Sequence, residues 1–356
     1  MGGMNRTIPY ALLAAALFGA STPLAKRLIG EVSPVLMGGL LYLGSGVGLG
    51  VARLLRDGGW KASGLAKGEW PWLLGAIFFG GIVGPVALLF GLTRISGSTA
   101  SLLLNLEAVL TALIAWLVFR ENAGRRVVLG MAAIVAGGVV LSWPASNTGT
   151  SDWIGPTLIA AACACWAIDN NLTRKVSASD ALFVAGSKGL IAGAFNTVLA
   201  MSVGAALPNA LTVSSAMLLG FLGYGLSLVL FVLALRSLGT ARTGAYFSVA
   251  PFIGAAVAIG LLGETATLQF WLAAALMALG VWLHLTEHHA HHHTHEAAAH
   301  EHSHWHDEHH QHVHEVAFAG DAANGHSHWH EHEPLMHGHG HVSDAHHRHR
   351  HRLRRG

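Results

Sequence analysis

Ten stretches of mostly apolar residues follow one another before residue 286, and each is long enough to cross a lipid bilayer as a helix. A transmembrane helix needs roughly 20 such residues to span about 30 Å of hydrocarbon. Soluble proteins carry charges on about a quarter of their positions, whereas this chain has 11% charged and 52% apolar residues. The sequence predicts an all-α integral membrane protein with spans at 10–28, 34–54, 70–91, 100–119, 127–143, 153–172, 182–206, 213–235, 243–262 and 268–285.

The chain also contains a weak internal duplication. The segment 11–27, ending FGASTPLAKR, aligns with 159–175, ending WAIDNNLTRK. LLFGLTRISGSTA at 88–100 aligns with LFVLALRSLGTAR at 230–242, and AVLTALIAWLVFRE at 108–121 aligns with PFIGAAVAIGLLGE at 251–264. We therefore expect a first five-helix unit over 8–143, a second over 153–285 and a separate tail over 286–356.

Each unit has an odd number of spans, so the two units must lie in the membrane in opposite orientations. The even-numbered loops carry eleven Lys and Arg residues and the odd-numbered loops carry three. Because cytoplasmic loops are enriched in Lys and Arg, the even loops and both termini are expected in the cytoplasm, with the protein in the cell membrane. Such inverted repeats are a common architecture of secondary transporters.

The duplicated blocks resemble a known family. The FGASTPLAK run, LEAVLTALIAWLVFREN and VAPFIGAAVAIGLLGE are similar to the EamA-type branch of the drug/metabolite transporter superfamily, over about residues 8 to 285. One departure is that Pro251 of the second unit corresponds to Ala108 in the first. The resemblance implies export of amino acids, metabolites or toxic compounds and identifies no single substrate.

Three ionisable residues lie deep enough in the apolar stretches to be candidate functional sites, because each costs about 2.5 to 3.5 kcal/mol there on insertion scales. These are Glu107, Lys188 and Asp169. Glu107 and Lys188 are placed near mid-membrane, so we expect them to form a pair that a substrate or a proton breaks. The alternative is that Lys188 extends to the interface and Glu107 bonds to a neighbouring helix, with no role in transport.

Further polar and aromatic residues could line a central cavity. The polar candidates are Asn105, Asn170, Asn171 and Asn196, and the aromatic candidates are Trp116, Tyr224, Tyr246 and Phe247. Tyrosine and tryptophan are also ordinary helix fillers and interface anchors. The Gly44/Gly48, Gly80/Gly84 and Gly189/Gly193 pairs have the small-xxx-small spacing that predicts close helix packing.

All 26 histidines lie in the last 73 residues. This tail has too little apolar surface to offset its ordering entropy, so we expect it to be disordered when empty. Alternating histidines and nearby acids suit nickel, cobalt, zinc or copper, although a His-rich composition does not select among metals. The candidate ligands are His302, His304, His306, His309, His326, His328, His330, His332, His337, His339 and His341.

Three functions remain open at this point. The helices could carry organic solutes beside an accessory metal-binding tail, carry a divalent metal that the tail captures, or chiefly anchor a metal-storage tail. No Gly-Lys pair occurs, so the chain has no recognisable phosphate-binding loop of an ATP motor. Because the spans lack histidine and hold few acids, we favour a small organic substrate. We expect no enzymatic activity, required cofactor or nucleic-acid partner, and a homodimer is left open.

Overall fold

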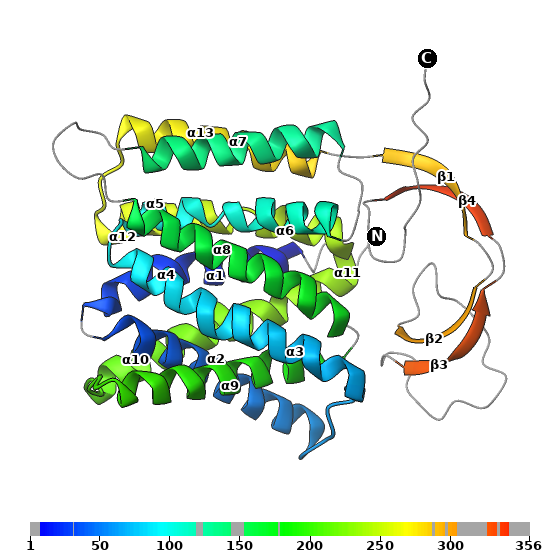
Figure 1. Cartoon of the computed structure of the whole chain (residues 1–356), viewed down its shortest axis with the longest axis horizontal. Helices are drawn as coiled ribbons and strands as arrows, with labels where there is room; N and C mark the ends of the chain where they lie inside the picture. The colour runs from blue at the N-terminus through cyan, green and yellow to red at the C-terminus, as the bar shows by residue number, and fades with distance from the viewer. Residues whose placement is uncertain are drawn as a thin grey trace.

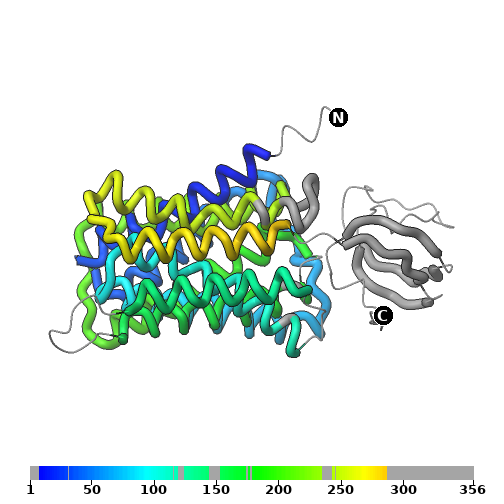
Figure 2. Tube along the Cα trace, turned by 90° about the horizontal axis from the view of Figure 1, so that it is seen from above, coloured from blue at the N-terminus to red at the C-terminus, as the bar shows by residue number. Residues whose placement is uncertain are grey.

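The computed structural model describes residues 8–30, 32–118, 124–143, 153–176, 179–286, 289–295, 298–304, 326–332 and 335–341. Its helices lie side by side in one bundle (Figures 1 and 2), and the start of α1 and the end of α13 lie at the same end of it. The helical elements are α1 (Ile8–Ile29), α2 (Pro34–Asp57), η2 (Lys67–Glu69), α3 (Trp70–Ala76), η3 (Ile77–Val83), α4 (Gly84–Leu92), α5 (Gly97–Leu103), α6 (Leu106–Leu117), α7 (Arg125–Ser142), α8 (Ile154–Thr173), η4 (Arg174–Val176), α9 (Ala181–Ser202), α10 (Ala210–Gly220), η5 (Phe221–Leu226), α11 (Ser227–Phe247), α12 (Ala250–Leu262) and α13 (Leu268–Leu285).

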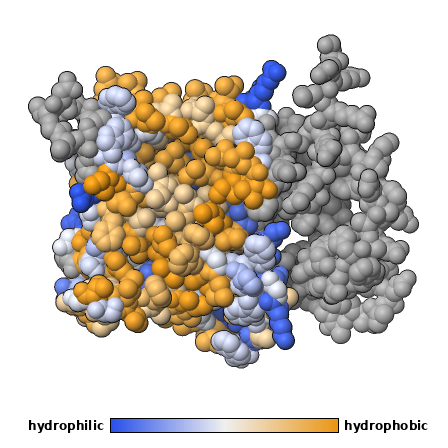
Figure 3. Space-filling model, viewed as in Figure 1, coloured by the Kyte–Doolittle hydropathy of each residue, from blue (hydrophilic) through white to orange (hydrophobic). Residues whose placement is uncertain are grey.

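These elements form the ten predicted passes. In the part of the chain that the structure describes, eight helical segments are long and apolar enough to cross a membrane on length and composition alone. The other two passes are α8, which carries Asp169 and two asparagines near its end, and α12, which is only 13 residues long. Figure 3 shows apolar side chains over much of the visible face of the bundle, as expected for a surface that meets lipid.

Corresponding helices of the two units are irregular at corresponding positions. The third pass contains the π-helical segment η3 and the eighth contains the π-helical segment η5, and both are rich in glycine. The fourth pass breaks between α5 and α6 at Leu104 and Asn105, and the ninth breaks before α12 at Ser248 and Val249. The shared pattern of interruptions supports the internal duplication that the sequence predicts.

The eighth and ninth passes differ from the predicted boundaries, because α11 includes part of both. The rings of Phe231 and Phe247 lie 4.9 Å apart between centroids. A straight helix would separate two such residues by about 24 Å, so the chain reverses direction between them. The sequence predicts a loop at this reversal, whereas the backbone there remains helical.

Glycines allow the two units to pack closely across α2 and α9. A Cβ at Gly46 would collide with the backbone of Leu190, and one at Gly193 would collide with the backbone of Leu43. A Cβ at Gly44 of α2 would likewise collide with the backbone of Met217 in α10. The close packing predicted from the small-xxx-small spacing is therefore confirmed at Gly44 and Gly193, and it makes α2 and α9 a tight seam between the units.

In the tail the structure describes four strands, β1 (His289–His295), β2 (Ala298–His304), β3 (His326–His332) and β4 (Leu335–His341). Antiparallel pairing joins β1 to β4 and β2 to β3. These segments pair where the sequence predicts no regular structure. An isolated two-stranded ribbon is marginally stable in water, so neither pairing is expected to be stable by itself.

Candidate functional site

The main polar contact within the spans joins α8 to α9. The Lys188 ammonium lies 2.6 Å from Asp169 Oδ1 and 2.7 Å from Oδ2. Thr173 Oγ1 donates a further hydrogen bond of 2.8 Å to Asp169 Oδ1. The exposed fractions of the two charged side chains are only 15% for Lys188 and 9% for Asp169. Because each charge would be costly to bury alone, the pair stabilises both ionised forms.

The predicted pairing of Glu107 with Lys188 is wrong. Glu107 lies in the first turn of α6, where its Oε1 accepts a hydrogen bond of 2.8 Å from Asn170 Nδ2. The same amide lies 3.4 Å from Thr111 Oγ1. Asp169 and Asn170 are neighbours on α8 but contact different partners. Helix α8 therefore contacts Lys188 of α9 through Asp169 and Glu107 of α6 through Asn170.

The π-helical segment η3 provides two backbone acceptors beside this ion pair. Tyr42 Oη donates to the Gly80 carbonyl at 2.6 Å, and Trp166 Nε1 donates to the same oxygen at 3.0 Å. Asn196 Nδ2 donates to the Gly81 carbonyl at 3.2 Å. A Cβ at Gly80 would collide with the carboxylate of Asp169. The absence of a side chain at Gly80 therefore lets the carboxylate of Asp169 approach η3.

Aromatic rings connect the contacts of η3 in the first unit to η5 in the second. Tyr42 lies 5.6 Å from Tyr224 of η5, and Tyr224 lies 6.0 Å from Phe18 of α1, between ring centroids. Phe18 in turn lies 5.5 Å from Phe247. Tyr42 thus contacts both π-helical segments, one in each unit. Tyr42 is not among the residues predicted from the sequence, although a tyrosine in the middle of an apolar stretch is a polar signal of the same kind as Tyr224.

The other predicted cavity residues are scattered. Asn105 is buried at the break between α5 and α6 and donates to the Leu102 carbonyl at 2.9 Å. Asn171 is also buried, and it donates to a carbonyl of its own helix. Tyr246 packs beside Ala11 and Ala234. Trp116 is 39% exposed near the end of α6, so its role as a cavity wall stays a prediction.

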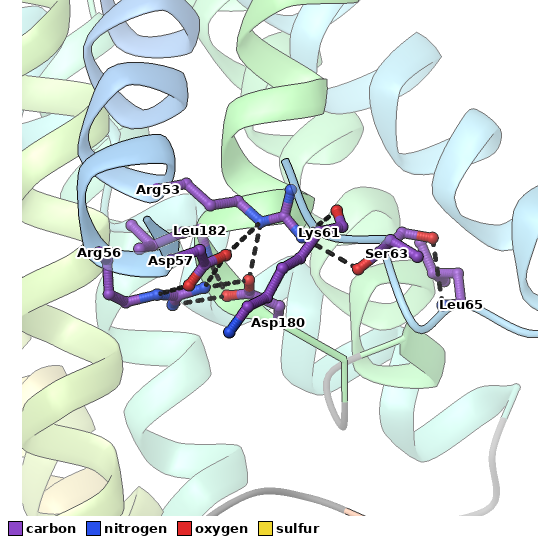
Figure 4. Close-up of polar contacts among 9 residues, drawn as sticks. Arg53, Arg56, Asp57, Lys61, Ser63, Leu65, Asp180 and Leu182 are labelled. Atoms are coloured by element: carbon purple, nitrogen blue, oxygen red, sulfur yellow. Dashed lines mark hydrogen bonds and ion pairs between the residues drawn. The ribbon is translucent and has the colours of Figure 1, made fainter. Parts of the chain in front are cut away.

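A charged network joins the two units at the end of the bundle where α2 ends and α9 begins (Figure 4). Arg53 Nε lies 2.9 Å from Asp180 Oδ2, and Arg56 Nη2 lies 2.6 Å from the same oxygen. Arg53 also donates to the carbonyls of Lys61 and Ala62, at 3.0 and 3.1 Å. Burial alone would raise the pKa of Asp180, but the hydrogen bonds from the two arginines lower it to about 2. Asp180 is therefore a charged residue that holds the start of α9 against the end of α2.

Most of the predicted metal ligands lie on the four strands. In the β2 and β3 pairing, His300 is opposite His330, His302 is opposite His328 and His304 is opposite His326. In β1 and β4, His289, His291 and His293 are opposite His341, His339 and His337. His332 is opposite Ala298. The predicted ligands His306 and His309 lie outside the described residues.

Ten passes in two similar units, with an ion pair and irregular helical segments inside the bundle, define a multi-pass membrane transporter. The model of the EamA-like transporter family matches residues 5–143 and 153–286, so the chain belongs to this family. An uncharacterized transporter of Methanothermobacter thermautotrophicus is 26% identical over 296 residues, covering 76% of this chain and 84% of its own length. A crystal structure of another protein matches with a TM-score of 0.59 and 20% identity, over 77% of this chain and 95% of that one, which shows the shared fold.

Proposed function

We propose that this transporter exports small organic solutes across the cell membrane by alternating access. The observation that carries the proposal is the Asp169 and Lys188 ion pair, held within the bundle beside η3. A buried pair is strongly destabilised when one partner is lost. A charged group of a solute that replaces one partner would restore the balance, so binding and opening of the pair would be coupled.

The composition of the spans favours an organic solute over a metal ion. A divalent transition metal would need several nitrogen, sulfur or carboxylate ligands along its route. The spans contain no histidine before His284, and only Glu107 and Asp169 lie within them as acids. Family membership supports export as the direction, and the positive charge of the even loops supports cytoplasmic termini.

The tail would be an accessory metal-binding segment in the cytoplasm. Histidines alternate along β2, β3 and β4, and in each ribbon three histidines of one strand are opposite three of the other in the register. Opposite positions of an antiparallel pair are close neighbours. Histidines from two strands can therefore bind the same metal ion. Neutral imidazole suits nickel, cobalt, zinc and copper.

The test is a flux screen on everted membrane vesicles with amino acids and other small organic solutes, with and without nickel, cobalt, zinc or copper. Full-length protein and a variant lacking 286–356 are compared, and the Lys188→Met variant is the inactive control. We expect solute uptake that requires Lys188 and survives loss of the tail.

Metal transport is the second candidate, and the abundance of histidine in the tail favours it. It predicts that metal uptake into the same vesicles falls when 286–356 is removed. Metal flux that requires both the tail and Lys188, together with no organic flux in any arm of the screen, would contradict the proposed organic substrate.

A further inference from the structure

At the end of the bundle opposite the charged network, a carboxylate of the second unit holds a helix of the first. Glu264 Oε1 accepts a hydrogen bond of 2.7 Å from the Gly97 amide, and Glu264 Oε2 accepts one of 2.8 Å from the Ser98 amide. These amides belong to the first turn of α5, where backbone donors have no partner within the helix. We call this contact the Glu264 clasp.

The local structure is suited to hold the carboxylate in place. Gly263 ends α12 with φ of 71°, a conformation that glycine adopts without strain. Glu264 follows directly, and its own amide donates to the Ala258 carbonyl at 3.2 Å. A Cβ at Gly97 would lie only 3.2 Å from Glu264 Oε1 and 3.3 Å from Pro23. Glycine at position 97 therefore allows the carboxylate to reach the amides.

Charge reinforces the contact. Burial alone would raise the pKa of Glu264, but hydrogen bonds from Ser98 and Gly97 and the nearby charge of Lys26 lower it. Lys26 Nζ donates to the Leu92 carbonyl at 2.8 Å and also to the Ile95 carbonyl. Hydrogen bonds from neutral donors to a charged acceptor are roughly twice as strong as neutral ones, so the Glu264 clasp is a strong link at this end.

The two clasped helices are each interrupted at their other end. Helix α5 ends at Leu103, before the break at Leu104 and Asn105, and α12 begins after the break at Ser248 and Val249. Each is thus a short half-helix with an irregular turn at the end away from the Glu264 clasp. The glycine seam of α2 and α9, in contrast, runs along whole helices and has no such interruption.

We propose that the Glu264 clasp is the gate of the transport route at the end opposite the tail, and that Glu264 is its gating residue. Release of Gly97 and Ser98 lets α5 and α12 separate about their breaks and opens this mouth. Re-formation of the two hydrogen bonds closes it. The inference rests on the proposed alternating access, but its test needs no substrate.

The gate is tested by the distance between spin labels on the two half-helices. Labels are placed by Thr99→Cys on α5 and Thr265→Cys beyond α12, in the full chain with Cys163→Ala and Cys165→Ala. Double electron–electron resonance in lipid nanodiscs then reports how much protein has the two half-helices apart.

The Glu264→Gln variant is compared with Glu69→Gln as a matched control. Glu69 also accepts from a backbone amide, that of Ala66 at 2.8 Å, but this contact lies within one loop. We expect Glu264→Gln to raise the ratio of long to short distances about tenfold, equivalent to about 1.4 kcal/mol, while Glu69→Gln leaves it unchanged. An unchanged ratio in Glu264→Gln, or an equal change in both variants, overturns the gate.

If Glu264→Gln fails to fold, Gly97→Ala tests the same contact, because the added methyl crowds Glu264 and leaves its charge in place. The same direction of change is expected, and an unchanged distance distribution in this variant also overturns the gate. Absence of flux in the solute screen, with the distance change present, would instead count against the proposed function alone.

Discussion

Lys188 of α9 contacts both carboxylate oxygens of Asp169 on α8, so the ion pair within the spans lies wholly in the second unit. Loss of one partner leaves the other charge buried, at a cost of about 3–5 kcal/mol. We expect Lys188→Met and Asp169→Asn each to abolish flux and to lower thermal stability in detergent. The double variant should recover most of the stability and none of the flux, and recovery of flux would show that the pair is structural only.

Glu107→Gln should abolish transport and leave the protein in the membrane. Glutamine keeps the shape of the side chain and can still accept from Asn170, which lies 2.8 Å from Glu107 Oε1, but it loses the charge. The measurement is vesicle flux beside the amount of folded protein from size-exclusion chromatography. Wild-type flux in this variant would remove Glu107 from the mechanism.

Gly80→Ala should disrupt the centre of the bundle through a single methyl group. The new Cβ would collide with the carboxylate of Asp169, and overpacking of this kind typically costs about 1–3 kcal/mol. Gly50→Ala is the matched control, because a Cβ there meets nothing within 4 Å. We expect lower thermal stability and lower flux only for Gly80→Ala, and equal behaviour of the two variants would contradict the described packing.

The contribution of the charged network at Asp180 to the free energy of unfolding should depend on pH. The pKa of Asp180 is about 2 in the folded protein and about 3.9 in an unfolded chain. Because the pKa is lower in the folded protein, ionised Asp180 stabilises the fold fully at pH values above its unfolded pKa. This stabilisation is lost as the pH falls towards 2.

Asp180→Asn should therefore destabilise the protein at pH 7 by about 1 kcal/mol, allowing for solvent screening of a partly exposed group. The difference in the free energy of unfolding between Asp180→Asn and the wild type should become smaller as the pH falls below about 4. Thermal unfolding in detergent across this pH range measures it. A difference that stays constant down to pH 2.5 would show that the network does not act through the charge of Asp180.

Much of the fold could be predicted from the sequence because lipid imposes simple rules. Span length, the duplicated blocks and the odd number of helices per unit were enough to predict ten passes in two inverted units. The cost of an ionisable group in lipid marks Glu107, Lys188 and Asp169 as candidates. The structure brings Lys188 onto Asp169 and Glu107 onto Asn170, and the transport roles of the three candidates stay predictions.

The partners of these residues could not be predicted. Helices that are apolar on all sides give no periodic pattern to fix their rotation, so sequence spacing could not decide whether Lys188 faces Glu107 or Asp169. The small-xxx-small spacing of Gly80 and Gly84 predicts packing positions, and nothing in it indicates that the carbonyls of Gly80 and Gly81 accept hydrogen bonds from side chains. The helical reversal within α11 could not be predicted because the Gly and Thr residues at 239–244 are typical of a loop.

The inverted architecture is tested most directly by cysteine accessibility in intact cells. Lys61→Cys lies in the loop after α2 and Thr265→Cys in the loop after α12, in a background without Cys163 and Cys165. A membrane-impermeant maleimide should label Thr265→Cys and leave Lys61→Cys unlabelled until the cells are permeabilised. Labelling of Lys61→Cys from outside intact cells, or of both positions from the same side, would contradict the two inverted five-helix units on which the transport proposal depends.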